Sequence, residues 1–423
     1  MGILLLNDFS ALASFEAFVA LFASLLSQGW ILFTLGFAIL VGSIMALIEK
    51  SGGIEGFVAL VQHERSFINT PRSSLLLSYF VGIVIFVEST ITSLVAGAIG
   101  KPLCDKHGIS REKLAFVCDS TAAPVSALIV LNGWGALLLG LIATQISLGQ
   151  ISGNSMDILI DSILYNFYAM SALVVTFLAI WFHIDLGEMK HAKPALIQSH
   201  RISVKQASMF LMLLPIVLMV VLVFVFLYIT GSGDILQGSG SSSIFYTMLF
   251  TWLFMLLYYV GTKNMSFKEW SVTSTQGAIK LIPIAAILLF AFALAQITVE
   301  LKTGFYLASL AQGVIRVEFL AVVIFLLSSL IAFSTGTSWG TFSIMIPVAV
   351  PMAVGMDANI ALCIGAAISG GVLGDHCSPI SDTTIVAAMA SECGLVEHVR
   401  TQLPYVLISA LISMILFFVF SIF

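Results

Sequence analysis

Long apolar runs separated by short polar loops dominate the chain. The runs 30–48, 158–184, 209–229, 244–261, 281–298 and 402–423 carry few charged residues or none. A helix rises about 1.5 Å per residue and a bilayer core is about 30 Å thick, so each run is long enough to cross. The pattern predicts an all-α polytopic membrane protein with about 9–11 transmembrane segments.

Other apolar stretches contain polar residues in their middle, at 88–93, 119–124, 334–341 and 374–384. Prolines stand in two of these segments, Pro124 and Pro379, and proline interrupts helical hydrogen bonding. Unsatisfied backbone is tolerated at membrane depth only where protein or water surrounds it. These segments therefore predict re-entrant or broken helices near the membrane midplane.

The two halves of the chain contain similar short segments in the same order. The run 49–53 resembles 300–304, the hydroxyl run 89–93 resembles 334–338, and 119–124 resembles 375–379. The loop 101–113 holds four Lys or Arg, whereas its counterpart 352–359 holds none. Opposite charge at equivalent loops favours an inverted repeat, an arrangement typical of secondary transporters with a midplane site.

This repeat predicts four regions. Residues 1–29 form an interfacial or first helix, 30–184 the first repeat, 185–280 linking spans and loops, and 281–423 the second repeat. Basic residues favour the cytoplasm, so the linkers 185–206 and 262–280 are expected inside and 230–243 outside.

Composition and motifs argue against several classes of function. The chain of 423 residues is 59% hydrophobic and 9% charged, with a net charge of −5. No basic field indicates nucleic acid, and no phosphate-binding loop or dinucleotide fingerprint is present. The five cysteines form no CxxC pair, and Asp375, His376 and Ser378 are too close in sequence to converge as a triad. We expect no enzyme and no cofactor.

The polar segments carry the chemistry expected of a cation site. Small cations such as Na⁺ bind carboxylate, hydroxyl and carbonyl oxygens, and unwound helices supply free carbonyls. A carboxylate in a low-dielectric site holds a proton more tightly, so it can exchange that proton for a cation. Asp375, Asp382 and Asp119 are the leading carriers. His376 either relays a proton or only holds the turn by a hydrogen bond.

The candidate residues fall into two groups. Those expected to bind the cation or proton are Asp375, Asp382, Asp119, His376, Ser378, Ser381, Thr383, Thr384, Ser120 and Thr121. The supporting hydroxyl groups and helix breaks are Glu88, Ser89, Thr90, Thr92, Ser334, Thr335, Thr337, Ser338, Pro124 and Pro379.

The run GDHCSPISDTT at 374–384 resembles the signature of the NhaC family of Na⁺/H⁺ antiporters, in the ion-transporter superfamily. The run STGTSWGTF at 334–342 and the residues 49–53 resemble other segments of that family. The resemblance implies a cation-coupled secondary transporter of the cytoplasmic (inner) membrane with re-entrant segments. It places the polar residues of 375–384 at the ion site and suggests a homodimer.

Two transport hypotheses follow. The first is Na⁺/H⁺ exchange by alternating access, with Na⁺ and H⁺ as the only ions needed. The alternative is an Na⁺-coupled carrier of a small organic solute such as an amino acid, with Trp134 and Trp339 lining a pocket for it. A channel is disfavoured because no polar stripe lines a continuous pore.

Overall fold

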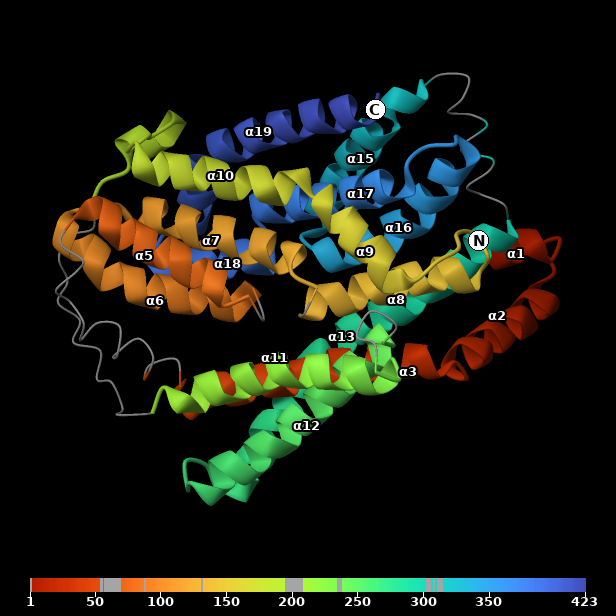
Figure 1. The fold of residues 1–423 in the computed structure, drawn as a ribbon, viewed down its shortest axis with the longest axis horizontal. Helices are drawn as coiled ribbons and strands as arrows, with labels where there is room; N and C mark the ends of the chain where they lie inside the picture. Colours follow the sequence, from red (N-terminus) through yellow and green to blue (C-terminus); the bar gives the residue numbers. More distant parts are fainter. Residues whose placement is uncertain are drawn as a thin grey trace.

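The computed structural model is built almost entirely of helices (Figure 1). It describes residues 2–53, 56, 70–86, 89–130, 132–194, 208–233, 238–301, 306, 309 and 315–423. The described residues form no sheet, and their one bridge joins Ser110 to Pro194. The short segment expected after 49–53, most of the segment expected after 300–304, and Glu88 lie outside the described residues.

The helices follow the apolar runs of the sequence. The first part of the chain contains α1 (Gly2–Leu6), α2 (Ala11–Leu26), α3 (Gly29–Ser51), α5 (Pro71–Val84), α6 (Ser89–His107), α7 (Arg111–Leu128), α8 (Gly133–Ser147), α9 (Ser155–Leu164) and α10 (Phe167–Trp181). The middle contains η2 (Gly187–His191), α11 (Phe210–Thr230), α12 (Gly240–Gly261) and α13 (Phe267–Glu300). The last part contains η4 (Val317–Phe319), α15 (Leu320–Thr335), α16 (Ser338–Gly355), α17 (Ile360–Cys377), α18 (Asp382–Ser391) and α19 (Leu395–Phe420).

Among the described residues, seven helices are long and apolar enough to cross a membrane, or nine if each bent pair counts as one span. The bent pairs are α7 with α8, at 40°, and α9 with α10, at 41°. The prediction of a plain span at 158–184 is therefore wrong, because the chain bends at Tyr165 and Asn166. Asn166 caps α10 and also donates to the Ala127 carbonyl, which satisfies backbone groups freed by the bend.

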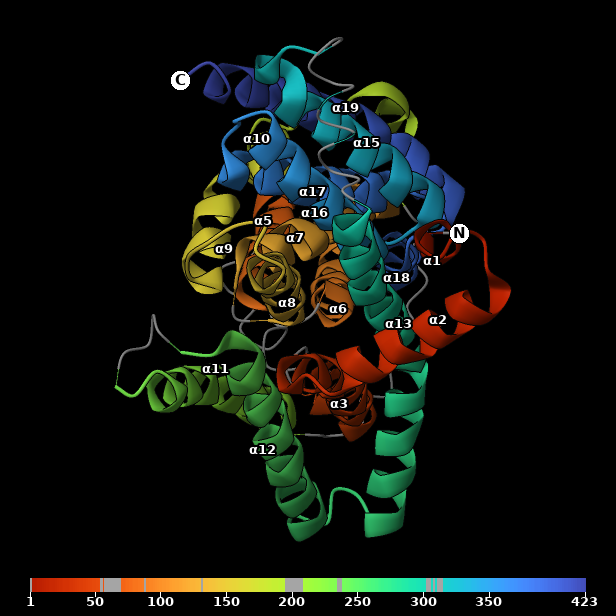
Figure 2. The same cartoon turned by 90° about the vertical axis from the view of Figure 1, so that its right-hand side faces the viewer.

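The middle helices form a separate layer. Figure 2 shows α3, α11, α12 and the first part of α13 below the bundle that contains α5–α10 and α15–α19, which they contact through α8 and α16. The prediction that 262–280 is a polar loop is largely wrong, because α13 begins at Phe267 and continues to Glu300 as one helix. Within this layer, α3 packs against both α12 and α13.

Two helical hairpins point toward each other in the bundle. Figure 1 shows α5 and α6 meeting near the middle of the molecule, with their outer ends at one end of the bundle; α15 and α16 also meet near the middle, but open toward the opposite end. The pairs α7–α8 and α17–α18 are broken beside these hairpins. This arrangement agrees with the inverted repeat expected from the sequence.

The helix starts define which positions correspond. The interval from Ser89, where α6 begins, to Ser338, where α16 begins, equals the interval from Arg111 to Ile360, where α7 and α17 begin. At this interval Asp375 corresponds to Ser126, not to Asp119. These helix starts therefore give a different register from the pairing of 119–124 with 375–379.

The break predicted at 119–124 is also misplaced. The helix α7 continues through Pro124 and ends at Leu128, with Asn132 as the N-cap of α8. Proline is tolerated inside membrane helices where neighbouring groups satisfy the freed carbonyl. Of the interruption expected at 88–93, residues 89–93 lie within α6, and the described non-helical residues between α5 and α6 are Ile85 and Phe86. The breaks at 334–341 and 374–384 lie within the predicted segments, at 336–337 and 378–381.

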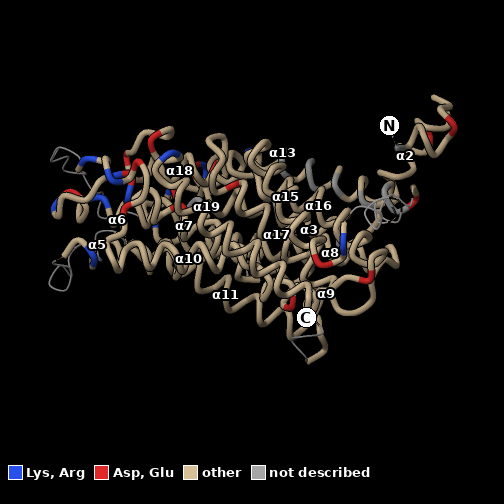
Figure 3. Tube along the Cα trace, turned by 90° about the horizontal axis from the view of Figure 1, so that it is seen from above, with Lys and Arg blue, Asp and Glu red and all other residues tan. Residues whose placement is uncertain are grey.

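The basic residues are distributed unevenly between the two ends of the bundle. Figure 3 shows Lys and Arg gathered mainly at the end where α5, α6 and α18 lie, and few at the other end. The linker after α10 and the turn between α12 and α13 lie at the basic end, and the turn between α11 and α12 at the other (Figure 1). This matches the alternation expected from the sequence, in which the basic linkers share one side of the membrane. Both termini lie at the opposite end.

Candidate functional site

The second broken span sets the geometry of the site. The helix α17 ends at Cys377, and α18 begins at Asp382 after the turn that holds Pro379. Proline lacks an N–H group and cannot continue the hydrogen bonding of α17. In the turn, the Ser378 N–H donates to the carbonyl oxygen of Asp375 at 3.2 Å. The carboxylate of Asp375 therefore lies at the end of α17, beside unwound backbone.

Hydroxyl groups hold both oxygens of the Asp375 carboxylate. Ser338 Oγ donates to Oδ2 at 2.5 Å, and Ser381 Oγ donates to Oδ1 at 2.7 Å. Thr383 Oγ1 lies 3.0 Å from Ser381 Oγ. All four residues are buried. We call Asp375, Ser338, Ser381 and Thr383 the Asp375 cluster; it joins the start of α16, the end of α17 and the start of α18.

The two breaks touch each other behind this cluster. Ser378 Oγ donates to the Phe333 carbonyl in α15 at 2.8 Å, and Thr384 Oγ1 donates to the Asp375 carbonyl at 3.3 Å. Gly336, between α15 and α16, has a φ of 66°. A Cβ atom there would lie 2.7 Å from the Ile380 carbonyl oxygen. Glycine is needed at this position for both the left-handed backbone and the close approach.

The electrostatics of the Asp375 cluster suit a small cation. Asp375 is 2% exposed, and no ion pair to Lys or Arg reaches it from any part of the chain that the structure describes. A buried carboxylate without a positive partner is costly, and either a proton or a bound cation removes that cost. Carboxylate and hydroxyl oxygens beside unwound backbone are suitable ligands for Na⁺.

The ring of His376 lies away from the Asp375 cluster. Its Nε2 is 3.1 Å from Ser120 Oγ in α7, and its Nδ1 is 2.7 Å from Tyr168 Oη in α10. Ser120 and His376 were both expected at the ion site, and the structure brings them together. Their contact joins α7 to α17 in the interior of the bundle.

Asp119 belongs to the same interior region. Its Oδ2 accepts hydrogen bonds from His398 Nε2 and from Gln402 Nε2, both at 3.1 Å. Gln402 Nε2 also donates to the carbonyl oxygen of His376, at 2.7 Å. Asp119 therefore forms a second polar cluster and contributes no hydrogen bond to the Asp375 cluster.

Several predicted residues have local roles or lie apart. Asp382 is exposed, and its Oδ1 accepts from the Thr383 N–H at the start of α18. Thr121, Ser334 and Thr335 donate to carbonyls of their own helices. Thr337 caps α16 by accepting from the Gly340 N–H.

The first hairpin carries its own hydroxyl groups. Ser89 and Thr92 are buried near the start of α6, and Thr92 donates to the Ile85 carbonyl. The side chain of Thr90 lies outside the described residues. Asn132 joins this hairpin to the first broken span, because its Nδ2 donates to the carbonyls of Phe86 and Ser126.

The two tryptophans expected to line a solute pocket lie near each other. Trp134 contacts Phe342 in α16 with ring centroids 5.8 Å apart. A Cβ atom placed on Gly133 would lie 3.4 Å from the Trp339 ring. The structure therefore packs the start of α8 against the start of α16 through aromatic rings.

Sequence reasoning missed Tyr168, His398 and Gln402. A signal for the last two was present in the buried polar residues of α19, His398, Gln402, Tyr405, Ser409 and Ser413, which recur every three or four positions. That spacing places polar side chains on one helical face, which then has to point into the protein.

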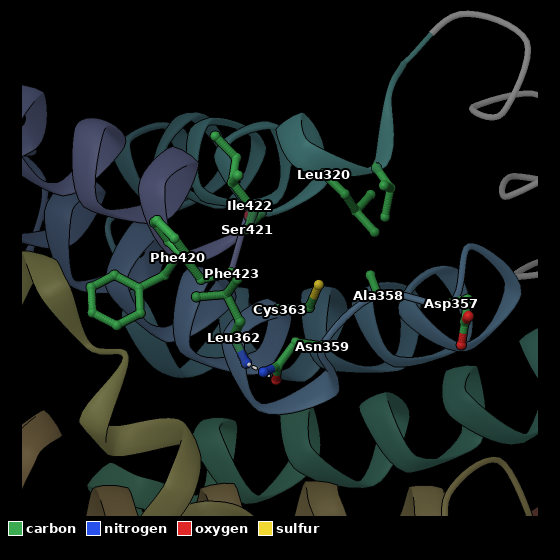
Figure 4. Close-up of a pocket in the computed structure, with 12 residues that line it drawn as sticks. Leu320, Asp357, Ala358, Asn359, Leu362, Cys363, Phe420, Ser421, Ile422 and Phe423 are labelled. Atoms are coloured by element: carbon green, nitrogen blue, oxygen red, sulfur yellow. Dashed lines mark hydrogen bonds between the residues drawn. The ribbon is translucent and has the colours of Figure 1, made fainter.

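A cavity of about 290 Å³ lies away from both polar clusters. Figure 4 shows it between the start of α15, the start of α17 and the C-terminal residues Phe420–Phe423. Asn359, on its wall, accepts a hydrogen bond from the Leu362 N–H at 3.0 Å and so caps α17. Because Asp375 is at the other end of α17, this cavity is not the ion site.

Within the described part of the chain, no group of three His, Cys, Asp or Glu side chains is placed to hold a metal ion. The Asp375 cluster instead offers one carboxylate and three hydroxyls, which are hard oxygen donors.

Comparisons with known proteins agree with a membrane transporter. A family model described as "Na+/H+ antiporter family" matches residues 132–422. An uncharacterized protein of Haemophilus influenzae is 33% identical over 398 residues, covering 87% of this chain and 74% of that protein. The malate-2H⁺/Na⁺-lactate antiporter of Bacillus subtilis is 37% identical over 105 residues, covering 24% of this chain and 22% of that one.

A solved structure shares the fold. The YdaH transporter of Alcanivorax borkumensis has a TM-score of 0.64 to this chain at 14% identity, and the match covers 97% of this chain and 89% of that one. At this identity the likeness concerns the arrangement of the helices.

Proposed function

Because the chain belongs to the Na⁺/H⁺ antiporter family, we propose that it exchanges Na⁺ for H⁺ across the cytoplasmic membrane by alternating access. The observation that carries this proposal is the Asp375 carboxylate, buried at a helix break with both oxygens bound to hydroxyls and no basic partner among the described residues. Such a carboxylate is stabilised by a positive charge bound beside it, which Na⁺ supplies in this proposal.

In this proposal Na⁺ binds at the Asp375 cluster. The hydroxyls of Ser338 and Ser381 turn their lone pairs toward the ion, and free carbonyls in the turn 378–381 complete its shell. The exposed Asp382, at the start of α18, attracts cations to the open side of the cluster. Binding of H⁺ and of Na⁺ excludes each other because a second positive charge is disfavoured in the same low-dielectric region.

Alternating access would use the two opposed hairpins. The hairpin of α15 and α16 opens away from the basic end and carries Ser338 at its tip, whereas α18 extends toward the basic end and carries Thr383 (Figure 1). Relative movement of these elements would open the cluster to one side of the membrane at a time.

The test is ion movement in liposomes. The purified protein is reconstituted with a pH dye inside, and Na⁺ is added outside without any organic solute. We expect Na⁺ to drive proton efflux. Absence of that response, together with Na⁺-dependent uptake of a labelled amino acid, would contradict the proposal and favour the alternative of a solute carrier.

Removing one hydroxyl from the Asp375 cluster should weaken Na⁺ binding. A hydrogen-bonding group on a charged partner contributes about 1.5–3 kcal/mol, so Ser338→Ala and Ser381→Ala are each expected to raise the apparent Kd for Na⁺ by about tenfold or more. Isothermal titration calorimetry measures this. Ser343→Ala is the matched control, because the buried Ser343 hydroxyl donates only to its own helix, at the Trp339 carbonyl. Equal Kd values in all three variants would show that the Ser338 and Ser381 hydroxyls do not bind Na⁺.

A further inference from the structure

Asp119, His398 and Gln402 form a second polar cluster in the interior of the bundle. Each of the three side chains is 0% exposed, and they come from α7 and α19. Both hydrogen bonds between them end on one oxygen, Asp119 Oδ2. We call these residues the Asp119 cluster.

Three atoms of the Asp119 cluster have no hydrogen-bond partner among the described residues: Asp119 Oδ1, His398 Nδ1 and Gln402 Oε1. His398 donates through Nε2, so its neutral ring leaves Nδ1 as an acceptor. All three unpartnered atoms are then acceptors. Buried acceptors without donors are rare and costly. One added proton, on the carboxyl group or on the ring, would supply a missing donor.

Among the described residues, no Lys or Arg acts on Asp119, and the positive groups near it are histidines. The titratable or charged groups that face it from the packed helices are Cys118 on α7, Tyr168 on α10, Asp375, His376 and Cys377 on α17, Asp382 on α18 and His398 on α19. Lys113, farther toward the start of α7, is bound to Asp185. A proton shared by Asp119 and His398 is therefore the available means of neutralising this carboxylate.

Two contacts of His376 link the surroundings of the Asp119 cluster to the end of α17, where Asp375 lies. Gln402 donates to the carbonyl of His376, the residue next to Asp375, and Ser120, the residue next to Asp119, contacts the His376 ring. Tyr168 holds the other ring nitrogen. A shift of the end of α17 on ion binding would therefore move both clusters.

We propose that Asp119 and His398 form the site of the transported proton, separate from the Na⁺ site at Asp375, with Gln402 and His376 coupling the two. This inference rests on the proposed Na⁺/H⁺ exchange. A proton on the Asp119–His398 pair and Na⁺ on Asp375 would place two positive charges in one low-dielectric region, which disfavours joint occupancy. Exchange then follows from repulsion between neighbouring sites, without both ions using one carboxylate.

The test separates Na⁺ movement from its coupling to H⁺. Proteoliposomes measure ²²Na⁺ in two modes: Na⁺/Na⁺ exchange at equal pH, which needs no proton site, and accumulation driven by a pH gradient. The variants are Asp119→Asn and His398→Gln. The control is Thr401→Val, because the Thr401 hydroxyl donates only to carbonyls of its own helix.

We expect both variants to keep Na⁺/Na⁺ exchange within about threefold of wild type and to lose about tenfold or more of the driven accumulation. Wild-type accumulation in both variants would overturn the proposal. So would loss of both modes in protein that keeps the wild-type Tm, because Asp119 would then belong to the Na⁺ route. His398→Gln remains informative if Asp119→Asn does not fold. A wild-type protein without driven accumulation would instead contradict the proposed exchange itself.

Discussion

Replacing Asp375 with asparagine is expected to abolish Na⁺/H⁺ exchange. Asparagine keeps the size of the side chain and can still accept from one of the two serine hydroxyls, while the other hydroxyl has to turn and accept from the amide N–H; the negative charge that binds the ion is removed. Loss of a buried charge partner costs about 3–5 kcal/mol, which corresponds to a fall of about 100-fold or more in affinity. Dye-reported proton flux and ²²Na⁺ exchange should both be lost, because the Na⁺ site itself is removed.

The control for this variant is Asp161→Asn. Asp161 is an exposed carboxylate on α9, so its replacement changes the net charge equally without touching a buried cluster. It should transport at the wild-type rate. Wild-type transport by the Asp375 variant would contradict the assignment of the Na⁺ site.

Replacing Gly374 with alanine is expected to destabilise the protein and to disable transport. A Cβ atom at Gly374 would lie 2.5 Å from the Phe333 backbone nitrogen and 2.6 Å from Ala332 Cβ, both in α15. The helices α15 and α17 would have to separate beside Asp375. Overpacking of this kind costs about 1–3 kcal/mol, although glycine-to-alanine changes in open helical positions stabilise by about 0.4–1 kcal/mol.

Thermal unfolding in detergent measures this effect. The matched substitution is Gly261→Ala at the end of α12, where a Cβ atom would meet nothing within 4 Å. We expect a lower Tm for the Gly374 variant and an unchanged or higher Tm for the Gly261 variant. An unchanged Tm in both would show that α15 and α17 do not pack as closely as the structure has them.

The sequence predicted the second broken span well because its signals are local. Pro379, Asp375 and the hydroxyls of 378–384 lie within one short run, and the helix does end there. The glycine at 336 and the hydroxyls after it similarly marked the tip of the hairpin. The site itself, however, depends on the contact of Ser338 with Asp375, which joins the start of α16 to the end of α17.

The first half was harder to predict because its breaks do not coincide with its prolines. Pro124 lies inside the continuous α7, whereas the bends at 129–132 and at Asn166 contain no proline. Asparagine stabilises both bends through side-chain hydrogen bonds to backbone groups. The short similarity between 119–124 and 375–379 suggested that Asp119 corresponds to Asp375. The helix starts of the two halves instead align Asp375 with Ser126.

The Asp119 cluster could not be predicted from sequence spacing. Asp119 and its partners His398 and Gln402 are far apart in the chain, and only the packing of α19 against α7 joins them. The polar face of α19 indicated that these residues point inward, but not which carboxylate they meet.

The most direct test of the account is proton release on Na⁺ binding. Purified protein in weakly buffered detergent solution is titrated with Na⁺ while a pH electrode follows the free proton concentration, and choline serves as the control cation. We expect Na⁺ to release protons from the wild-type protein and choline to release none. In the Asp375→Asn variant we expect no Na⁺-dependent proton release. Na⁺ binding detected by calorimetry without any proton release would contradict it.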